Sequence, residues 1–246
     1  MTRAALALGV ILALPGVAQA VECRSADHGG QSYTVCEVAP AREDLRLFLY
    51  DDEGTPYGQF GSIDRALAPS GEVLGFAMNA GMYHSDRAPV GHYVEDGREL
   101  RGVITSAGPG NFGLLPNGVM CLRQGRADVI ETKDYVAQSP DCTHASQSGP
   151  MLVIDGKLHP RFLPDSTSRY IRNGVGTSAD GQRAVFVISD QPVTFHEFGS
   201  LFRDALDLPN ALYFDGNISR LHAPGIGRSD LGFWLGPIVG VVEAVK

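Results

Sequence analysis

Residues 166–177 read Ser-Thr-Ser-Arg-Tyr-Ile-Arg-Asn-Gly-Val-Gly-Thr, and the apolar run Ala184–Ile188 follows. Arg169 and Arg172 stand close together, and Asn173 and two glycines come directly after them. Arginine offers a fixed fork of donors that suits phosphate or carboxylate, and glycines let backbone N–H groups approach the same anion. The stretch therefore predicts a site for an anionic group, with phosphate preferred. The alternative is a basic turn that leads into a glycine-rich hairpin.

The length of 246 residues allows one large domain or two small ones. No internal repeat, linker or low-complexity tract divides the chain, which favours one domain. The 30 glycines and 15 prolines indicate many turns and hence a strand-rich fold. We therefore expect a single α+β domain with a mixed, strand-rich, twisted sheet and few helices.

Apolar runs, alternating or continuous, predict most of the secondary structure. Strands are expected at 32–38, 45–50, 73–78, 90–94, 99–105, 119–122, 128–135, 151–154, 184–188, 212–214 and 238–242. The strongest helix pattern covers Thr194–Leu208, where Thr194 and Glu197 have the spacing of a capping box and apolar side chains recur at helical spacing. A shorter helix is expected at Ser62–Leu67.

Residues 1–20 have the features of a secretory signal peptide. Arg3 forms the positive n-region, Ala4–Leu14 is almost wholly apolar, and Ala18-Gln-Ala20 is a small-x-small cleavage site. The apolar run is too short to span a bilayer, and no later segment is apolar for long enough. We therefore expect a domain of residues 21–246 that is periplasmic or secreted and has no transmembrane anchor.

All four cysteines, Cys23, Cys36, Cys121 and Cys142, follow the expected leader, and export would place them in an oxidising compartment. Four cysteines allow three connectivities. Neighbourhood in the sequence favours the pairs Cys23–Cys36 and Cys121–Cys142, each worth roughly 3 kcal/mol in the chain-entropy model. The alternative is a zinc site, but no Cys-x-x-Cys or paired histidine spacing supports it. We therefore expect disulfides and no metal.

The formal net charge is −8, and loss of Arg3 with the leader makes the chain one unit more negative. An acidic protein is a poor candidate for non-specific nucleic-acid binding, so no nucleic-acid partner is expected. Residues 108–113 match the pattern G-x-G-x-x-G, but Leu114–Gly118 follow them where a dinucleotide site would open a helix. We expect no cofactor, and the sequence leaves the oligomeric state open.

Four apolar strands adjoin short clusters of polar residues and glycine, around Asn79, around Ser148, in the residues before Ala184, and around Asp215. Loops gathered by a rigid sheet are common places for binding and catalytic residues. Each cluster also has a structural interpretation, since Asn79 and Ser148 can cap turns and Asp215 can open an Asp-Gly turn. No G-x-S-x-G elbow surrounds Ser148, which argues against a covalent serine.

Four short motifs occur in order along most of the chain from Leu45 to Val242. They are Asn79-Ala-Gly81-Met-Tyr83, Gln147-Ser148-Gly149-Pro-Met-Leu152, Arg169-x-x-Arg172-x-x-Val175-Gly176, and Asp215-Gly216 with Ser219. In this order they resemble the phosphodiester glycosidase domain family, which includes N-acetylglucosamine-1-phosphodiester alpha-N-acetylglucosaminidase. The resemblance is strongest to the bacterial exported branch of the family.

The resemblance implies hydrolysis of a sugar–phosphate diester at the anomeric C–O bond. Arg169 and Arg172 would neutralise the departing phosphate, and Asp215 would activate water or support an oxocarbenium-like centre. The remaining motif positions would contact sugar hydroxyls or phosphate oxygens. These positions are Asn79, Gly81, Gln147, Ser148, Gly149, Asn173, Gly216, Asn217 and Ser219.

The chain departs from the family at Asn217-Ile218, where a run of glycines is expected, and at Asn173, where a threonine is expected. These departures, and the lack of an evident acid/base pair, favour as an alternative a non-catalytic exported module that binds anionic glycans. On either hypothesis the partner is a phosphodiester-linked sugar or an anionic glycan. A serine hydrolase that uses Ser148 is the third hypothesis.

Overall fold

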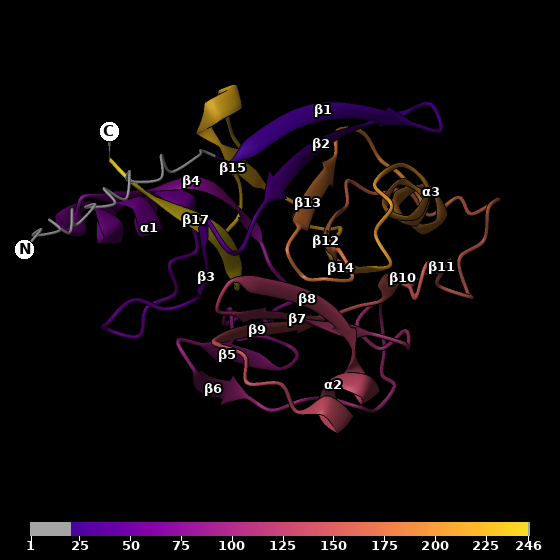
Figure 1. Cartoon of the computed structure of the whole chain (residues 1–246), viewed down its shortest axis with the longest axis horizontal. Helices are drawn as coiled ribbons and strands as arrows, with labels where there is room; N and C mark the ends of the chain where they lie inside the picture. The colour runs from indigo at the N-terminus through magenta and orange to yellow at the C-terminus, as the bar shows by residue number, and fades with distance from the viewer. Residues whose placement is uncertain (1–20, 246) are drawn as a thin grey trace, which may run out of the picture.

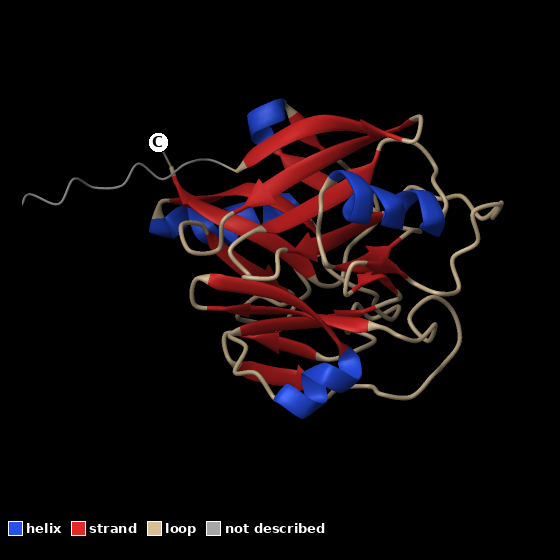
Figure 2. Cartoon of the chain, turned by 45° about the vertical axis from the view of Figure 1, so that its right-hand side comes forward, coloured by secondary structure: helices blue, strands red, loops and turns tan. Residues whose placement is uncertain are grey.

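The computed structural model describes residues 21–245, which form three antiparallel sheets with short helices at the periphery (Figures 1 and 2). The expected signal peptide, residues 1–20, lies outside the described residues. None of the helices between residues 21 and 245 is long and apolar enough to cross a membrane. The α+β, strand-rich, single-domain fold expected from the sequence is confirmed.

The largest sheet has seven strands and carries the stretch that opens the sequence analysis. Its strands, in spatial order, are β1 (Glu22–His28), β2 (Gln31–Val38), β13 (Ala184–Ser189), β12 (Asn173–Thr177), β14 (Asn210–Asp215), β10 (Met151–Ile154) and β11 (Lys157–Leu158). In the central ladder between β12 and β14, Asn173 lies opposite Asp215. The register of this sheet therefore places two of the expected site residues side by side.

The second and third sheets have five strands each. The second runs β16 (Arg228–Ser229), β15 (Leu221–Ala223), β4 (Glu72–Asn79), β17 (Ile238–Ala244) and β3 (Asp44–Phe48). The third runs β6 (Arg98–Arg101), β5 (Tyr93–Glu95), β9 (His144–Ser148), β7 (Gly118–Arg123) and β8 (Arg126–Glu131). Figure 1 shows the third sheet below the other two.

The main core joins side chains of all three sheets, and Phe76 of β4 packs on Phe186 of β13 with ring centroids 5.0 Å apart. A second core lies beneath the helical segment that follows β13. Glycines of β12 allow this close packing, because a Cβ at Gly174 would lie 2.4 Å from the carbonyl oxygen of Leu212 and one at Gly176 only 2.8 Å from Phe202. These two glycines thus serve strand packing in a hairpin rather than an anion.

The helices agree with the sequence in part. Helix α1 (Phe60–Leu67) and α3 (Phe195–Ser200) lie where helices were expected, and the capping box of Thr194 and Glu197 is present. After α3 the chain continues as a π-helical turn, Leu201–Ala205, and short 3-10 turns occupy Ala68–Ser70 and Pro224–Ile226.

The strand expected at 128–135 is wrong in its second half. Strand β8 ends at Glu131, and residues Thr132–Gln138 form helix α2. The side chain of Glu131 accepts hydrogen bonds from the backbone N–H groups of Lys133 and Asp134, which caps the helix. Because glutamate is not a usual N-cap residue, the start of this helix carries no standard sequence signal.

Both disulfides favoured by the sequence are present. Cys23 and Cys36 are directly opposite each other in the β1–β2 hairpin, and Cys121 of β7 is joined to Cys142 in the link before β9. The first bridge joins the two strands at one edge of the seven-stranded sheet. The second links the segment that follows α2 to the third sheet.

Candidate functional site

Strands β4, β12 and β14 bring Asn79, Asn173 and Asp215 together at the junction of two sheets. The side-chain amides of Asn79 and Asn173 are buried and donate to each other, with both N···O distances 3.1 Å. Asn173 Oδ1 also accepts the backbone N–H of Asp215 at 3.2 Å. The two asparagines therefore fix the backbone that carries the carboxylate.

Hydrogen bonds made by Ser219 and Arg220 hold the loop after β14 beside the two asparagines. The Ser219 hydroxyl lies 2.9 Å from the Asp215 carbonyl oxygen and 3.1 Å from that of Ile171, and both can accept its proton. The backbone N–H of Arg220 donates to Asn79 Oδ1 at 3.0 Å. The side chains of Asn79, Asn173 and Ser219 are thus engaged within the protein, which gives them a positioning role in this geometry.

A cavity of about 300 Å³ opens in front of this network. Its lining combines one cation, one carboxylate, two tyrosines, one methionine, one glycine and three small polar side chains. The lining residues are Met82, Asn111, Ser168, Tyr170, Arg172, Tyr213, Asp215, Gly216 and Asn217. Four of these residues, Arg172, Asp215, Gly216 and Asn217, belong to the expected site. The structure therefore brings the central arginine and the carboxylate of a separate segment to one cavity.

Arg172 is fully buried, with 0% of its surface exposed. Its Nε donates to the carbonyl oxygen of Val193 at 2.8 Å and its Nη2 to that of Ser168 at 3.1 Å. The guanidinium lies 3.7 Å from the centroid of the Phe195 ring. The third nitrogen, Nη1, is buried with no hydrogen-bond partner among the described residues.

None of the ion pairs between described residues involves Arg172. Burial accordingly lowers the pKa of its guanidinium, an effect that Tyr213 and Tyr170 partly oppose. A buried arginine remains charged, and an unpaired buried charge is costly. An anion in the cavity would give this guanidinium a partner of opposite charge.

Asp215 is partly buried, and its Oδ1 accepts the backbone N–H groups of Gly216 at 2.6 Å and Asn217 at 2.9 Å. Burial raises the pKa of Asp215, and the backbone N–H groups of Asn217, Gly216 and Ile218 oppose that rise. Because both short bonds end on Oδ1, the second oxygen is left to meet a water molecule or a substrate atom. The carboxylate is thus oriented by its own turn.

Tyr213 brings an aromatic hydroxyl to the same cavity. Burial raises the pKa of Tyr213 well above its usual range, and the neighbouring Arg172 and Asn111 oppose the rise. A Cβ at Gly216 would lie 2.2 Å from the Tyr213 hydroxyl oxygen. Only glycine at position 216 leaves room for this hydroxyl beside Asp215.

Arg169, the other expected catalytic arginine, does not line the cavity. It forms a two-pronged ion pair with Glu197, with N···O distances of 2.9 and 2.7 Å. Glu197 is the residue that completes the capping box of α3. In this geometry Arg169 fastens the loop before β12 to the start of α3.

The motif around Ser148 does not line the cavity. The buried Ser148 hydroxyl donates to the carbonyl oxygen of Phe214, and the Gln147 side chain bonds the backbone of His92 and Ile104. Gly81 and Gly149 are sites of close packing. This placement of Ser148 supports a positioning role and gives no support to a serine nucleophile.

Sequence reasoning did not identify five residues of the lining: Met82, Asn111, Ser168, Tyr170 and Tyr213. Three of them stand inside or next to motifs that the sequence did single out, so proximity to a motif was the available signal. Asn111 comes from the glycine-rich segment 108–113, whose formal match to a nucleotide motif gave no hint of this position. Tyr213 reads as one more apolar residue of strand β14.

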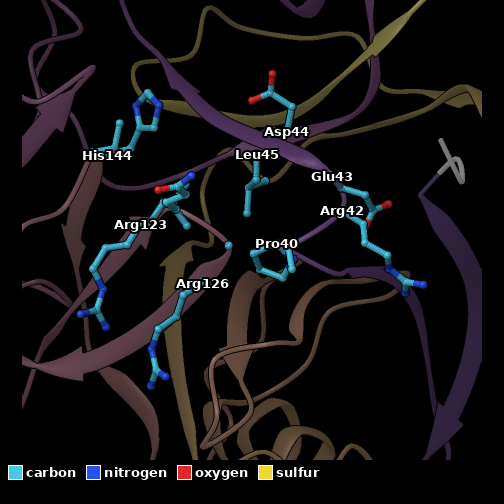
Figure 3. A pocket seen from close by; sticks show the side chains of 13 residues that line it. Pro40, Arg42, Glu43, Asp44, Leu45, Arg123, Arg126 and His144 are labelled. Atoms are coloured by element: carbon cyan, nitrogen blue, oxygen red, sulfur yellow. The ribbon is translucent and has the colours of Figure 1, made fainter. Parts of the chain in front are cut away.

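A different cavity, of about 340 Å³, contains three arginines but does not gather their charges. Figure 3 shows Arg42 on one side and Arg123 and Arg126 on the other, with the guanidinium group of Arg42 pointing away from the other two. Arg123 and Arg126 both pair with Asp128. Within residues 21–245 no group of three or more His, Cys, Asp or Glu side chains is arranged to hold a metal ion.

Comparison with known proteins adds a family to this geometry. A model of the phosphodiester glycosidase family matches residues 73–222. The uncharacterized protein YigE of Escherichia coli (strain K12) is 33% identical over 195 residues, which cover 79% of this chain and 74% of that protein.

Two solved structures have a similar fold. One is the catalytic domain of zebrafish N-acetylglucosamine-1-phosphodiester alpha-N-acetylglucosaminidase, auto-inhibited by its pro-peptide, with a TM-score of 0.61, 12% identity, and coverage of 90% of this chain and 81% of that chain. The other is a hypothetical protein from Synechocystis, with a TM-score of 0.59, 13% identity, and coverage of 90% of this chain and 61% of that chain.

Proposed function

The chain belongs to the phosphodiester glycosidase family, and from this premise we propose that it hydrolyses the anomeric C–O bond of sugar-1-phosphate diesters in cell-envelope or extracellular glycans. The observation that carries the proposal is the buried guanidinium of Arg172, which has no carboxylate partner within residues 21–245 and shares a cavity with Asp215. A phosphodiester supplies the anion that this guanidinium lacks.

Arg172 would bind the phosphate through Nη1, because Nε and Nη2 already donate to backbone carbonyl oxygens. Those two bonds and the Phe195 ring hold the guanidinium in place before substrate arrives. A donor fixed in advance stabilises charge that develops during a reaction without reorganising. As the C–O bond breaks, negative charge grows on the phosphate oxygen, where Arg172 would stabilise it.

Asp215 would take a proton from the attacking water. The oxygen of that water bonds to the anomeric carbon, and the phosphomonoester leaves with the electron pair of the broken C–O bond. A raised pKa suits a general base that works near neutral pH. Because a phosphomonoester is a stable anion, the reaction has little need for a second carboxyl group as general acid.

Most of the remaining expected residues would position Arg172 and Asp215 rather than contact the substrate. Asn79, Asn173 and Ser219 would hold the Asp215 backbone, and Ser148 would hold the end of β14 through Phe214. Gly216 and Asn217 line the cavity and would contact substrate. Arg169 would act through Glu197 by fixing the loop that ends in Arg172.

Export to the periplasm or the medium is part of the proposal. The leader expected at residues 1–20 supports it, and so do the two disulfides, since such bridges persist in oxidising compartments. An exported enzyme of this kind would act on phosphodiester-linked sugars outside the cytoplasm.

The test is a panel of sugar-1-phosphodiesters that differ in sugar, anomer and aglycone, incubated with the purified mature protein. Release of the phosphomonoester would be followed by phosphorus NMR. We expect turnover of at least one compound, and a loss of about a hundredfold or more in kcat/KM in Arg172→Ala and in Asp215→Asn. Arg203→Met, which removes an exposed guanidinium paired with Asp204, is the matched control.

Two results would count against the proposed activity. The first is no turnover across the panel, and the second is unchanged turnover in a folded Arg172→Ala protein. Binding of the same compounds without hydrolysis, unaffected by Asp215→Asn, would instead support the alternative of a non-catalytic module for anionic glycans.

A further inference from the structure

The loop 231–234, Leu-Gly-Phe-Trp, displays apolar side chains to solvent beside the cavity. Leu231 is 90% exposed, Phe233 77% and Trp234 48%. They are three of the nine large apolar side chains that are exposed among the described residues, gathered within four positions. A cluster of this kind on an otherwise ordinary surface marks a place where something binds.

The backbone of this apolar loop is held firmly, so the exposure is not a sign of a loose segment. Arg220 donates to the carbonyl oxygens of Asp230 and Phe233, at 2.7 to 3.1 Å. Gln59 donates to the carbonyl oxygen of Gly232, and the N–H of Leu235 donates to that of Gly58. The side chains are therefore presented in a fixed arrangement, which lowers the entropic cost of binding.

Tyr83 links the apolar loop to the cavity. Its hydroxyl donates to the carbonyl oxygen of Trp234 at 3.1 Å, and the preceding residue, Met82, lines the cavity. Burial and, next, the charge of Asp215 raise the pKa of Tyr83. Tyr170, which is also exposed in part, stands at the cavity with its Cβ 3.4 Å from a Cβ built at Gly216. Tyr170 thus lies at the Asp215–Gly216 turn, and Tyr83 lies at the apolar loop.

From this arrangement we infer that the apolar loop 231–234 is a binding subsite for uncharged sugar rings of the substrate that lie beyond the cleaved phosphodiester. The inference rests on the proposed function and names its substrate class as a glycan of several sugar units. A cavity of about 300 Å³ holds little more than one sugar and its phosphate, so the rest of such a chain must lie on the surface outside. Aromatic rings offer large, rigid faces for the C–H surfaces of a sugar ring.

Charge favours a neutral glycan over a membrane surface as the occupant. Loops that dock on membranes usually combine apolar residues with free lysine or arginine for anionic lipids. Two of the neighbouring arginines are engaged in hydrogen bonds or ion pairs, because Arg220 bonds backbone carbonyl oxygens and Gln59, and Arg228 pairs with Asp190 and Asp230. The third, Arg87, lies over the Tyr83 ring with its guanidinium 5.4 Å from the ring centroid. The acidic chain as a whole gives anionic lipids no attraction.

Trp234 is the single tryptophan of the chain, so its fluorescence reports directly on the loop. The probes are an N-acetylglucosamine-1-phosphodiester with a tetrasaccharide aglycone, the same diester with a methyl aglycone, inorganic phosphate, and vesicles of phosphatidylcholine with and without phosphatidylglycerol. In Asp215→Asn we expect the emission to change with the tetrasaccharide diester only. An equal response to the methyl diester, no response to any probe, or a response to vesicles alone would overturn the inference.

Kinetics of the active protein give a second test. In Leu231→Ser/Phe233→Ser the ratio of kcat/KM for the tetrasaccharide diester to that for the methyl diester should fall about tenfold, chiefly through KM. Val136→Ser, which removes an exposed apolar side chain from α2, should leave this ratio unchanged. Equal losses on both substrates would mean a structural role and refute the subsite. If the wild type hydrolyses no compound of the whole sugar-1-phosphodiester panel, the proposed function fails, whereas the fluorescence test still decides the inference.

Discussion

At the scale of single residues, the carboxyl group of Asp215 sets the expected pH dependence of activity. Its pKa is raised by burial, above the ordinary value of 3.8. Only the ionised carboxylate can take a proton from water, so kcat/KM should fall as the pH drops through this raised pKa. A profile of kcat/KM against pH measures the pKa at which activity falls. An acid limb centred at or below the usual aspartate range would contradict the assignment of Asp215 as the base.

The unpaired guanidinium of Arg172 predicts that phosphate stabilises the folded protein. A ligand that binds only the native state adds about 2.7 kcal/mol at a hundred times its Kd, which raises Tm by several degrees. We expect inorganic phosphate to raise the Tm of the wild type and of Arg203→Met, but not that of Arg172→Met. Thermal scans at increasing phosphate concentration measure this. An equal rise in Arg172→Met would place the anion elsewhere.

A partly buried carboxyl group outside the cavity, Glu95, should make stability depend on pH independently of the candidate site. Burial raises its pKa from 4.5 to about 7, and the Tyr93 hydroxyl donates to it at 2.8 Å. The native state keeps the Glu95 proton at pH values where the unfolded chain has lost it. The resulting stabilisation is complete below about pH 4.5 and is lost as the pH rises through 7.

Glu95→Gln mimics the protonated form at every pH. The Tm of this variant relative to wild type should therefore be higher at pH 8 than at pH 4.5, and thermal scans at both values measure the difference. A Tm difference that does not change with pH would mean that Glu95 titrates normally in the folded state.

At the scale of elements, the sequence predicted those features that local patterns determine. Each of the eleven expected apolar runs overlaps an observed strand, and the spacing of Thr194 and Glu197 located the start of α3. Strand β12 was not expected as a strand, because its Asn-Gly-Val-Gly-Thr sequence has the composition of a turn. Its glycines are required by neighbours such as Leu212, which are distant in sequence, so no local pattern could reveal their role.

In the candidate site, too, the sequence predicted what local motifs determine and missed what distant residues determine. Asn79, Arg172, Asn173 and Asp215 stood in recognisable motifs, and the structure brings them together. The sequence could not distinguish the roles of Arg169 and Arg172, because both sit in one motif. Their difference arises from partners in other segments: Glu197 neutralises Arg169, whereas backbone carbonyl oxygens and aromatic rings surround Arg172.

The close packing of β12 against β14 predicts that a single methyl group added at Gly174 destabilises the folded protein. A Cβ at Gly174 would lie 2.4 Å from the backbone oxygen of Leu212, so Gly174→Ala must push the two strands apart. Overpacking of this kind costs about 1–3 kcal/mol or more. Urea unfolding measures it. Gly225→Ala is the control, because a Cβ there meets nothing within 4 Å, and equal stability of the two variants would contradict the packing argument.

At the scale of the whole molecule, the site depends on sheets that different parts of the chain build. Asn79 comes from the second sheet, Asp215 from the first, and Ser148, which holds the end of β14, from the third. The main core joins the same three sheets. Activity and the fold should therefore be lost together as the protein unfolds.

The two disulfides allow this dependence to be tested, because they lie in different sheets and neither cysteine pair lines the cavity. Each bridge closes a short loop, with sequence separations of 13 and 21 residues, and should contribute about 3 kcal/mol. Cys23→Ala/Cys36→Ala and Cys121→Ala/Cys142→Ala should each lower Tm by several degrees, and their effects should add in the quadruple variant.

Activity at 25 °C should survive in both double variants, while the temperature at which activity disappears should move down with Tm. Parallel measurements of turnover and of circular dichroism against temperature check this. If turnover vanished in either variant while the circular dichroism of the fold persisted, the site would depend on one sheet locally. The coupling of all three sheets through the common core would then be refuted.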